Sequence, residues 1–249
     1  MTAPGNRQLH VDAVTIYVAT HLVRAYESGG GEGSSWFRTG APSDELNAVL
    51  RLGGDLPTEI ERLRDLFDGI PASWHFWRDI DSPEIPSLLT QSGLALFETE
   101  PLMLFTGASE SAHHDLGQHE LARIEQVTDD LGLAQWAALW SDTTDTDALV
   151  AGLRQGLDLA TTHYLLWRDH GEVLGCAAVV TSPAGASIEH IVTRTEHRGR
   201  GIGTALTRRA LELALDSGTD RVVLTASPVG ERIYERLGFA TVGHVDRYA

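Results

Sequence analysis

The chain has 249 residues, of which 42% are hydrophobic, with a formal net charge of −16 and one cysteine. This apolar content can form a buried core, and the acidic balance argues against nucleic acid as a partner, because its binding needs Lys and Arg to neutralise phosphates. No run reaches 18 apolar residues and the first residues lack a signal-peptide core, so we expect no membrane partner; a lone Cys176, in an apolar run, excludes an internal disulfide and favours a cytoplasmic protein.

Helical and strand patterns alternate along the first half of the chain. Residues 9–28 have apolar residues at helical spacing and end in GGGEG, which predicts a helix and a flexible turn. Two further helices are expected at 57–70 and 83–94, and strands at 35–40, 46–52, 72–80 and 98–105. In the aromatic strand, Trp74 and Phe76 share one face opposite Trp77, which favours core packing, with a substrate-facing Trp77 as the alternative.

Residues 106–118 are small and polar, which is typical of a linker between two units. We therefore expect an N-terminal lobe at 1–105 and a second domain at 119–249. Three histidines lie nearby, but their spacing matches no zinc signature, so no metal site is predicted; they are His113, His114 and His119. From residue 119 onward the patterns predict the order βααβββαβαβ.

The stretch HRGRGIGTAL at 197–206 follows the strand pattern SIEHIVT and begins a long helical pattern. Unpaired N–H groups and the positive end of the dipole at a helix start, with glycines beside them, favour a diphosphate. The stretch is not a Walker A loop, because no Lys follows the glycines. It is not a dinucleotide-binding fingerprint either, because position 204, which would have to be Gly, is Thr. A third pattern is present: Arg or Gln, two residues, Gly, one residue, and then Gly or Ala. Arg198, Gly201 and Gly203 fill it.

With these residues the sequence resembles the GNAT superfamily of acetyl-CoA-dependent N-acetyltransferases. The strand at 187–193 and the downstream stretch TASPVGERIYERLGF at 225–239 match the family's linked motifs. The resemblance implies an α/β (α+β) GNAT fold over about residues 119–249, with a mixed central sheet and flanking helices. The first half is similar to the degenerate GNAT-like lobe of tandem members, among them mycothiol-synthase-like proteins; an unrelated α/β cap is the alternative.

The resemblance also implies acetyl-CoA, or another acyl-CoA, as the cofactor. The pantetheine arm would pair with the backbone of Ile191, Val192 and Thr193. The diphosphate would be held by the loop and first helical turn, at Arg198, Gly199, Arg200, Gly201, Ile202, Gly203 and Thr204. Two residues depart from the family pattern. Thr195 stands where Pro is frequent, and Ser227, a further expected cofactor contact, stands where Asn is frequent.

The same resemblance makes Tyr234, before Leu-Gly-Phe, the general acid for the departing thiolate, since a phenol is protonated at neutral pH. Glu189 and His190 are the candidates for the base; as neighbours on a strand they should face opposite sides of the sheet, so only one would reach the acyl site. A third possibility is that no dedicated base exists.

The sequence therefore predicts an enzyme that transfers an acetyl group to a primary amine of a small molecule by direct attack on the thioester. Acetylation of a protein or peptide and a non-catalytic CoA-binding regulator are the alternatives. A chain with two lobes is compatible with a monomer or a homodimer.

Overall fold

The computed structural model describes residues 4–23, 25–31, 33–107 and 117–249. The first half contains α1 (Pro4–Val23), β1 (Glu27–Gly31), β2 (Ser34–Arg38), η1 (Asp44–Leu46), β3 (Asn47–Arg51), α2 (Leu56–Leu66), β4 (Ser73–Trp77), α3 (Ile85–Gln91) and β5 (Leu96–Phe105). The second half contains α4 (Gln118–Leu121), β6 (Ile124–Gln126), α5 (Asp130–Ala137), α6 (Thr146–Asp158), β7 (Thr162–Asp169), β8 (Glu172–Ser182), β9 (Gly185–Thr193), η3 (Thr195–His197), α7 (Ile202–Asp216), β10 (Val222–Thr225), α8 (Glu231–Arg236) and β11 (Phe239–Tyr248).

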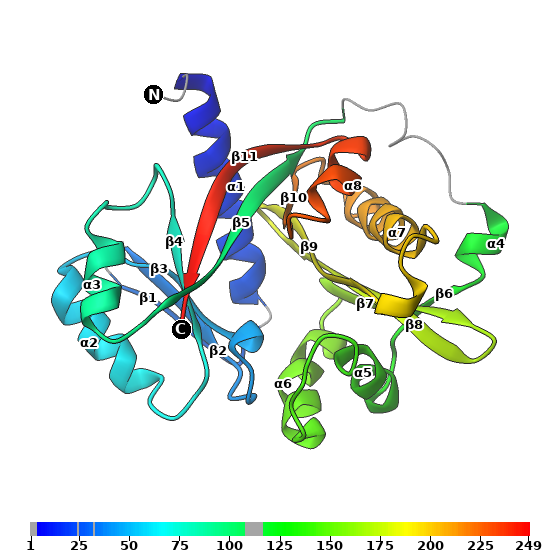
Figure 1. Cartoon of the computed structure of the whole chain (residues 1–249), viewed down its shortest axis with the longest axis horizontal. Helices are drawn as coiled ribbons and strands as arrows, with labels where there is room; N and C mark the ends of the chain where they lie inside the picture. Colours follow the sequence, from blue (N-terminus) through cyan, green and yellow to red (C-terminus); the bar gives the residue numbers. More distant parts are fainter. Residues whose placement is uncertain (1–3, 24, 32, 108–116) are drawn as a thin grey trace.

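All described strands form one mixed sheet in the order β1-β2-β3-β4-β11-β5-β10-β9-β8-β7-β6, with helices on both faces (Figure 1). Two neighbouring pairs are parallel, β3 with β4 and β9 with β10, and each is joined by a crossover helix, α2 or α7. The remaining pairs are antiparallel. The expected mixed α/β sheet with flanking helices is confirmed.

The same order of elements occurs twice. Three strands, a helix, a strand, a helix and a last strand run from β1 to β5 and again from β7 to β11. The last strands are exchanged: β11 pairs with β4 and β5, whereas β5 pairs with β11 and β10. We propose residues 1–105 and 119–249 as the two units of this repeat. The last strand of each unit pairs with strands of the other unit.

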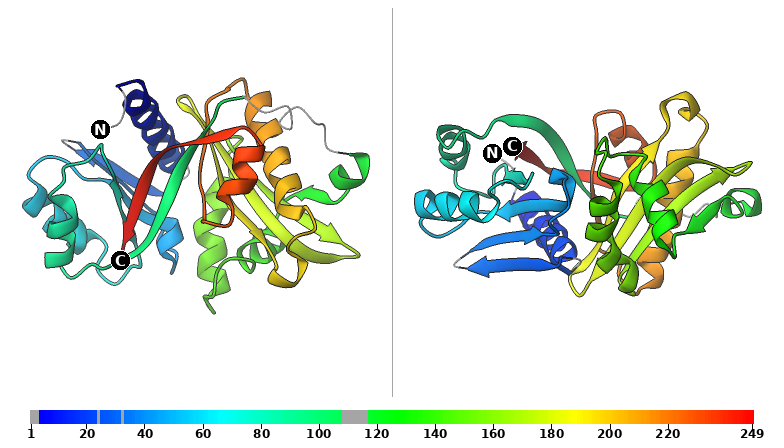
Figure 2. Two further views of the ribbon diagram at one scale, coloured as in Figure 1. Left: turned by 45° about the horizontal axis from the view of Figure 1, so that its top comes forward. Right: turned by 90° about the horizontal axis from the view of Figure 1, so that it is seen from below.

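The layers follow from the alternation of side chains along the strands. Val222 and Leu224 pack with α7 in one cluster, while Val223 between them packs under α1 on the other face. The face opposite α7 is covered by α5 and α6 over β7 and β8. Helices α2 and α3 cover the first half, and Figure 2 shows α1 standing between the two halves.

Trp77 lies in the core under α1. It is 0% exposed, its Nε1 donates to the carbonyl of Leu50 at 2.8 Å, and it packs on the face opposite Trp74 and Phe76. A substrate-facing Trp77 is therefore wrong, because the ring and its polar atom are both satisfied inside the core.

Two local expectations are also wrong. The helix expected to reach residue 28 ends at Val23, and the glycines 29–31, expected in a flexible turn, lie in β1. There Gly29 pairs with Trp36, and a β-carbon on it would lie 2.6 Å from the Trp36 ring. A bare backbone is needed there because the indole covers it. The strand expected from residue 119 begins with the short helix α4 and is limited to β6.

Among the described residues, no helix combines the length and the apolar character that a membrane span requires.

Candidate active site

The glycine loop leads from η3 into α7 with two residues in left-handed backbone. Gly199 has φ +76° and Gly201 has φ +82°, a region that residues with side chains rarely adopt. A β-carbon on either glycine would meet no atom within 4 Å, so the space in front of the backbone is open. Gly201 is the N-cap of the 15-residue α7, and the first turn carries no acidic side chain. This concave start of a helix is suited to an anion.

The neighbouring end of β9 has one unpaired edge. β9 pairs with β10 only at Ala186 and Ser187, and β10 then continues along β5 instead. On its other side β9 remains paired with β8, through Val192 with Cys176 and through Thr193 with Gly175. Within the described part of the chain, the β9 edge at Ile191, Val192 and Thr193 is thus available to an extended ligand that pairs as a strand would.

The structure brings the predicted cofactor residues together along this path. Ile191, Val192 and Thr193 lie on the open part of β9. The diphosphate candidates follow in the loop and the first turn of α7, where Nε of Arg198 donates to the carbonyl of Thr193 at 3.2 Å. Ser227 lies after β10, with its Oγ accepting from the N–H of Gly230 at 3.2 Å.

A bulge in β9 changes the arrangement of the two candidate bases. Two residues of β9 lie opposite one of β8 between the pairs Ala178–Glu189 and Cys176–Val192, and His190 has φ +51°. The prediction that Glu189 and His190 face opposite sides of the sheet is wrong, because the bulge turns both toward the same pocket.

The two side chains nevertheless have different partners. His190 stacks on Trp140 of the loop after α5, with ring centroids 4.6 Å apart, and contacts the edge of Trp136. Glu189 accepts a hydrogen bond from Oγ of Ser187 at 2.6 Å, and its Oε1 lies 3.5 Å from Nε2 of His21 on α1. Glu189 thus contacts polar side chains of β9 and α1, and the ring of His190 packs against two indoles.

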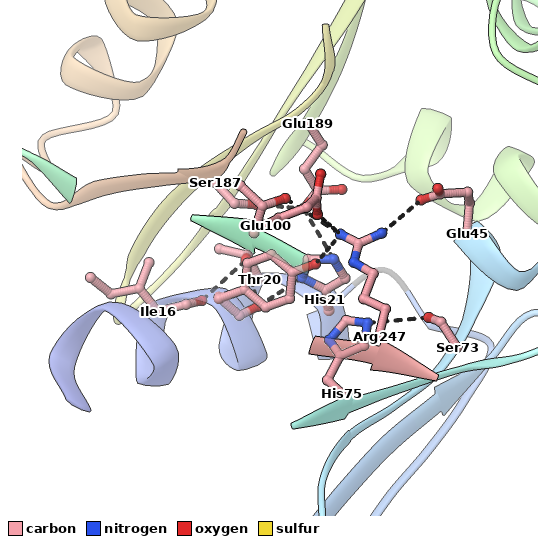
Figure 3. Close-up of polar contacts among 12 residues, drawn as sticks. Ile16, Thr20, His21, Glu45, Ser73, His75, Glu100, Ser187, Glu189 and Arg247 are labelled. Carbon is pink, nitrogen blue, oxygen red and sulfur yellow. Dashed lines mark hydrogen bonds and ion pairs between the residues drawn. The ribbon is translucent and has the colours of Figure 1, made fainter. Parts of the chain in front are cut away.

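The pocket has a volume of about 250 Å³ and lies between the two halves of the chain. From the second half it is lined by the β9 residues 188–192, Ser227 and Tyr234. The first half contributes three carboxylates on one wall, Glu45, Glu98 and Glu100. Arg247 of β11 crosses this wall, 2.8 Å from Glu100 and 3.6 Å from Glu45 (Figure 3). With Glu189, four carboxylates and one guanidinium give the pocket a negative charge.

Tyr234 lies on α8 and is 8% exposed. Burial raises the pKa of its phenol well above the ordinary value, and the nearby Glu100 carboxylate adds to the rise. The hydroxyl thus keeps its proton at any physiological pH, as a proton donor must. Cys176, by contrast, is buried among the strands, burial raises the pKa of its thiol, and its Sγ donates to the carbonyl of His190.

Sequence reasoning missed the part of the pocket that the first half and β11 contribute. His21, His75, Glu100 and Arg247 belong to no motif, and the order of the strands alone brings them to β9. The alternation ETE at 98–100 is the one local signal, since it predicts two carboxylates on the same face of β5. Of the three histidines near the linker, His113 and His114 lie outside the described residues, and His119 contacts Arg123 at 3.1 Å.

His75 should make the stability of the protein sensitive to acid. Burial, with help from Arg247 and His21, holds the pKa of His75 well below 6.5. As pH falls through about 6.5, His75 becomes protonated in the unfolded chain but stays neutral in the folded chain. The contribution of His75 to the free energy of unfolding is therefore present above about pH 6.5 and is lost as pH falls below it.

Between pH 7.5 and 5.5 the free energy of unfolding of the His75→Gln variant should fall by about 1.4 kcal/mol less than that of the wild type, measured by urea denaturation. The fully exposed His170, whose side chain is 96% exposed, provides the control His170→Gln, which should follow the wild type. An identical acid response of all three proteins would contradict a neutral buried His75.

Comparison with known proteins agrees with this geometry. Residues 128–239 match the Acetyltransferase (GNAT) family. The chain is 22% identical over 205 residues to a mycothiol acetyltransferase of Corynebacterium aurimucosum, covering 70% of this chain and 67% of that protein. Its fold is similar to a GCN5-related N-acetyltransferase of Kribbella flavida, with a TM-score of 0.67, 18% identity and coverage of 100% and 96% of the two chains. A tandem GNAT protein from the clavulanic acid biosynthesis pathway gives a TM-score of 0.57 at 15% identity, over 89% and 80% of the chains.

The fold, the glycine loop and these matches define an acyl-CoA-dependent N-acetyltransferase. Residues 128–239, in the second half, match the GNAT family, whose cofactor is acetyl-CoA. The chain as a whole has the fold of GNAT proteins, including a tandem one with two lobes.

Proposed function

We propose that the enzyme acetylates a primary amine of a small molecule, which binds in the pocket between the two halves. The observation that supports this most is the convergence of Glu189, Tyr234 and the carboxylate wall on one cavity of about 250 Å³. A cavity of this size accepts a small molecule or the end of a longer one. Carboxylates beside it favour a cationic amine through charge-assisted hydrogen bonds.

The residues present fit the cofactor. The open edge of β9 at Ile191, Val192 and Thr193 would hold the pantetheine arm, and the diphosphate would lie against the glycine loop, where no side chain fills the space. The exposed Arg198 and Arg200 can add charge to this anion site. Bound acetyl-CoA supplies an acetyl group that is activated as a thioester.

The side chains of the pocket then have separate tasks. Glu189 removes a proton from the ammonium group of the acceptor, because only a neutral amine with a free electron pair is a nucleophile. Tyr234 holds the proton that the departing sulfur needs. The amine attacks the thioester directly. A covalent acyl-enzyme on Cys176 is disfavoured, because burial raises the pKa of this thiol and it keeps its proton.

The test is release of free CoA from acetyl-CoA by the purified protein with a panel of small amines, diamines and amino sugars, beside lysine-containing peptides. We expect turnover with at least one small cationic amine and none with its N-acetylated form. The Glu98→Gln variant should raise KM for that amine several-fold, because one carboxylate of the wall is lost, and leave the Kd for acetyl-CoA unchanged.

Other outcomes would overturn the proposal in different ways. Turnover with peptides alone would move the acceptor to a protein or peptide. Binding of acetyl-CoA with no turnover by any amine would favour a regulator without catalysis.

A further inference from the structure

His21 on α1 reaches across from the first half to the strand of the candidate base. Its side chain is 6% exposed and that of Glu189 is 9% exposed. Nε2 of His21 lies 3.5 Å from Oε1 of Glu189, the same oxygen that accepts from Ser187 (Figure 3). The imidazole stacks on Tyr17, with ring centroids 4.0 Å apart, so its orientation is fixed from within α1.

The hydrogen bond at the other ring nitrogen determines where the proton sits. Nδ1 of His21 lies 2.7 Å from the backbone carbonyl of Tyr17, and a carbonyl oxygen can only accept. Nδ1 therefore carries a hydrogen. In the neutral ring this leaves a lone pair on Nε2, which faces the carboxylate of Glu189. Two electron-rich atoms buried at this distance favour the capture of one proton between them.

We propose that His21 is a positioning residue, which fixes Glu189 and shares with it the proton that the acceptor amine releases. This inference rests on the proposed function, with Glu189 as the base. The acceptor R–NH₃⁺ gives one proton to Glu189 and becomes R–NH₂. Glu189 passes this proton to Nε2 of His21, so the pair changes from neutral imidazole and carboxylate to imidazolium and carboxylate. The proton then leaves to water, and no covalent bond other than those to hydrogen changes.

Several other charged or titratable groups surround this pair. Tyr17 stacks on His21 from α1, and His75 of β4 and Arg247 of β11 lie in the same cluster. The positive charge of Arg247 disfavours a second positive charge on His21. Arg247 forms ion pairs with Glu100 of β5 at 2.8 Å and with Glu45 at 3.6 Å, however, which offset this effect. The cationic Arg247 thus has its own carboxylates, and Glu189 is the acidic residue of β9 that contacts His21.

The pair also gives α1 a role in catalysis. The GNAT family match begins at residue 128, more than a hundred residues after His21, so the base of the second half depends on a helix outside the matched region. α1 packs against β8, β9, β10 and β11, which holds His21 in place over the active strand.

The test compares His21→Gln, Glu189→Gln and the double variant with the acceptor found above. Glutamine fills most of the space and can still donate to Glu189, but it cannot take up a proton. We expect His21→Gln to lower kcat/KM about tenfold at pH 7.5, within the range for assisted proton transfer. Between pH 6 and 8 the rate should change less with pH than in the wild type. The double variant should be no slower than Glu189→Gln alone, because both residues act on one proton.

The control is His10→Gln, another buried histidine of α1, which is 3% exposed and faces Gly243 of β11 instead of Glu189. It should keep the pH dependence of the wild type, and all variants should bind acetyl-CoA with an unchanged Kd. An equal loss in His10→Gln would show that any change in α1 disturbs the enzyme, and additive losses in the double variant would show independent roles. Either result would overturn the inference.

A second readout needs no acceptor. In protein labelled with ¹⁵N-histidine, the His21 resonances, identified by their loss in His21→Gln, should show the Nδ1–H form when neutral. His21 should take up its second proton at a lower pH in Glu189→Gln than in the wild type. An unchanged midpoint, or the opposite neutral form, would overturn the proton-sharing pair. Absence of acetyl transfer from the wild type would contradict the proposed function, while this spectrum still decides on the pair.

Discussion

Gly201→Glu should abolish measurable binding of acetyl-CoA, raising Kd at least about 100-fold by isothermal titration calorimetry. Gly201 is the N-cap of α7 and faces open space where the diphosphate is expected. A carboxylate there fills that space and places a negative charge beside the phosphates. Like charges in contact cost several kcal/mol, and each 1.4 kcal/mol is about tenfold in Kd.

Two controls separate charge from backbone strain. Gly201 has φ +82°, so any side chain strains the loop, but Asn tolerates left-handed backbone better than most residues. Gly201→Asn should weaken binding by less than about tenfold, since it adds no charge. Gly218→Glu repeats the charged substitution at φ +92° beyond the other end of α7, and should bind as the wild type does. Similar losses in Gly201→Asn and Gly201→Glu would assign the effect to strain and leave the anion site unsupported.

The second half of the chain is predictable because its signals are local. The glycines at 199 and 201 are needed by the backbone of a single loop, and the helix after them shows its period within 15 residues. The strand before the loop and the Tyr234 helix after it lie close in sequence. The cofactor path was predicted from such neighbours. Its residues lie at one end of β9, in the glycine loop and at the start of α7, except Ser227, which follows β10.

The strand pairing of the first half and the bulge in β9 could not be predicted from the sequence in the same way. The exchange of β5 and β11 depends on hydrogen bonds between strands about 140 residues apart, for which no local pattern exists. The bulge at His190 adds one residue on β9 without changing the alternation of residue types that predicted opposite faces. Both features decide which side chains meet in the pocket. The exchange brings Arg247 to Glu100, and the bulge brings His190 to the side of Glu189.

These two features also explain why one pocket has walls from both halves. β11 begins after α8, which carries Tyr234, and ends in the first half beside β4, with Arg247 opposite His75. A substitution in the first half can therefore alter the chemistry of the second without touching the cofactor path. Substitutions at Glu98 and His21 should act on the acceptor and on its proton, whereas those at Gly201 should act on the cofactor.

Tyr234→Phe should lower kcat about 100-fold and leave the Kd for acetyl-CoA unchanged. Phenylalanine preserves the packing on Phe239, whose ring centroid lies 6.3 Å from that of Tyr234, but it cannot donate a proton to the departing sulfur. Proton donation of this kind contributes about 10²–10⁴-fold to rates. Since burial raises the pKa of Tyr234, the wild type should show no loss of activity from ionisation of this phenol up to about pH 9.

The control for this substitution is Tyr164→Phe, which removes a hydroxyl of a different role. Tyr164 is 2% exposed, and its hydroxyl donates to the carbonyl of Leu153 at 3.2 Å. Its loss should cost about 1 kcal/mol of unfolding free energy and leave kcat within about twofold. A Tyr234→Phe variant with kcat near the wild-type value would show that the phenol of Tyr234 does not donate the proton to the sulfur. A fall in kcat with weaker acetyl-CoA binding would instead assign Tyr234 to holding the cofactor.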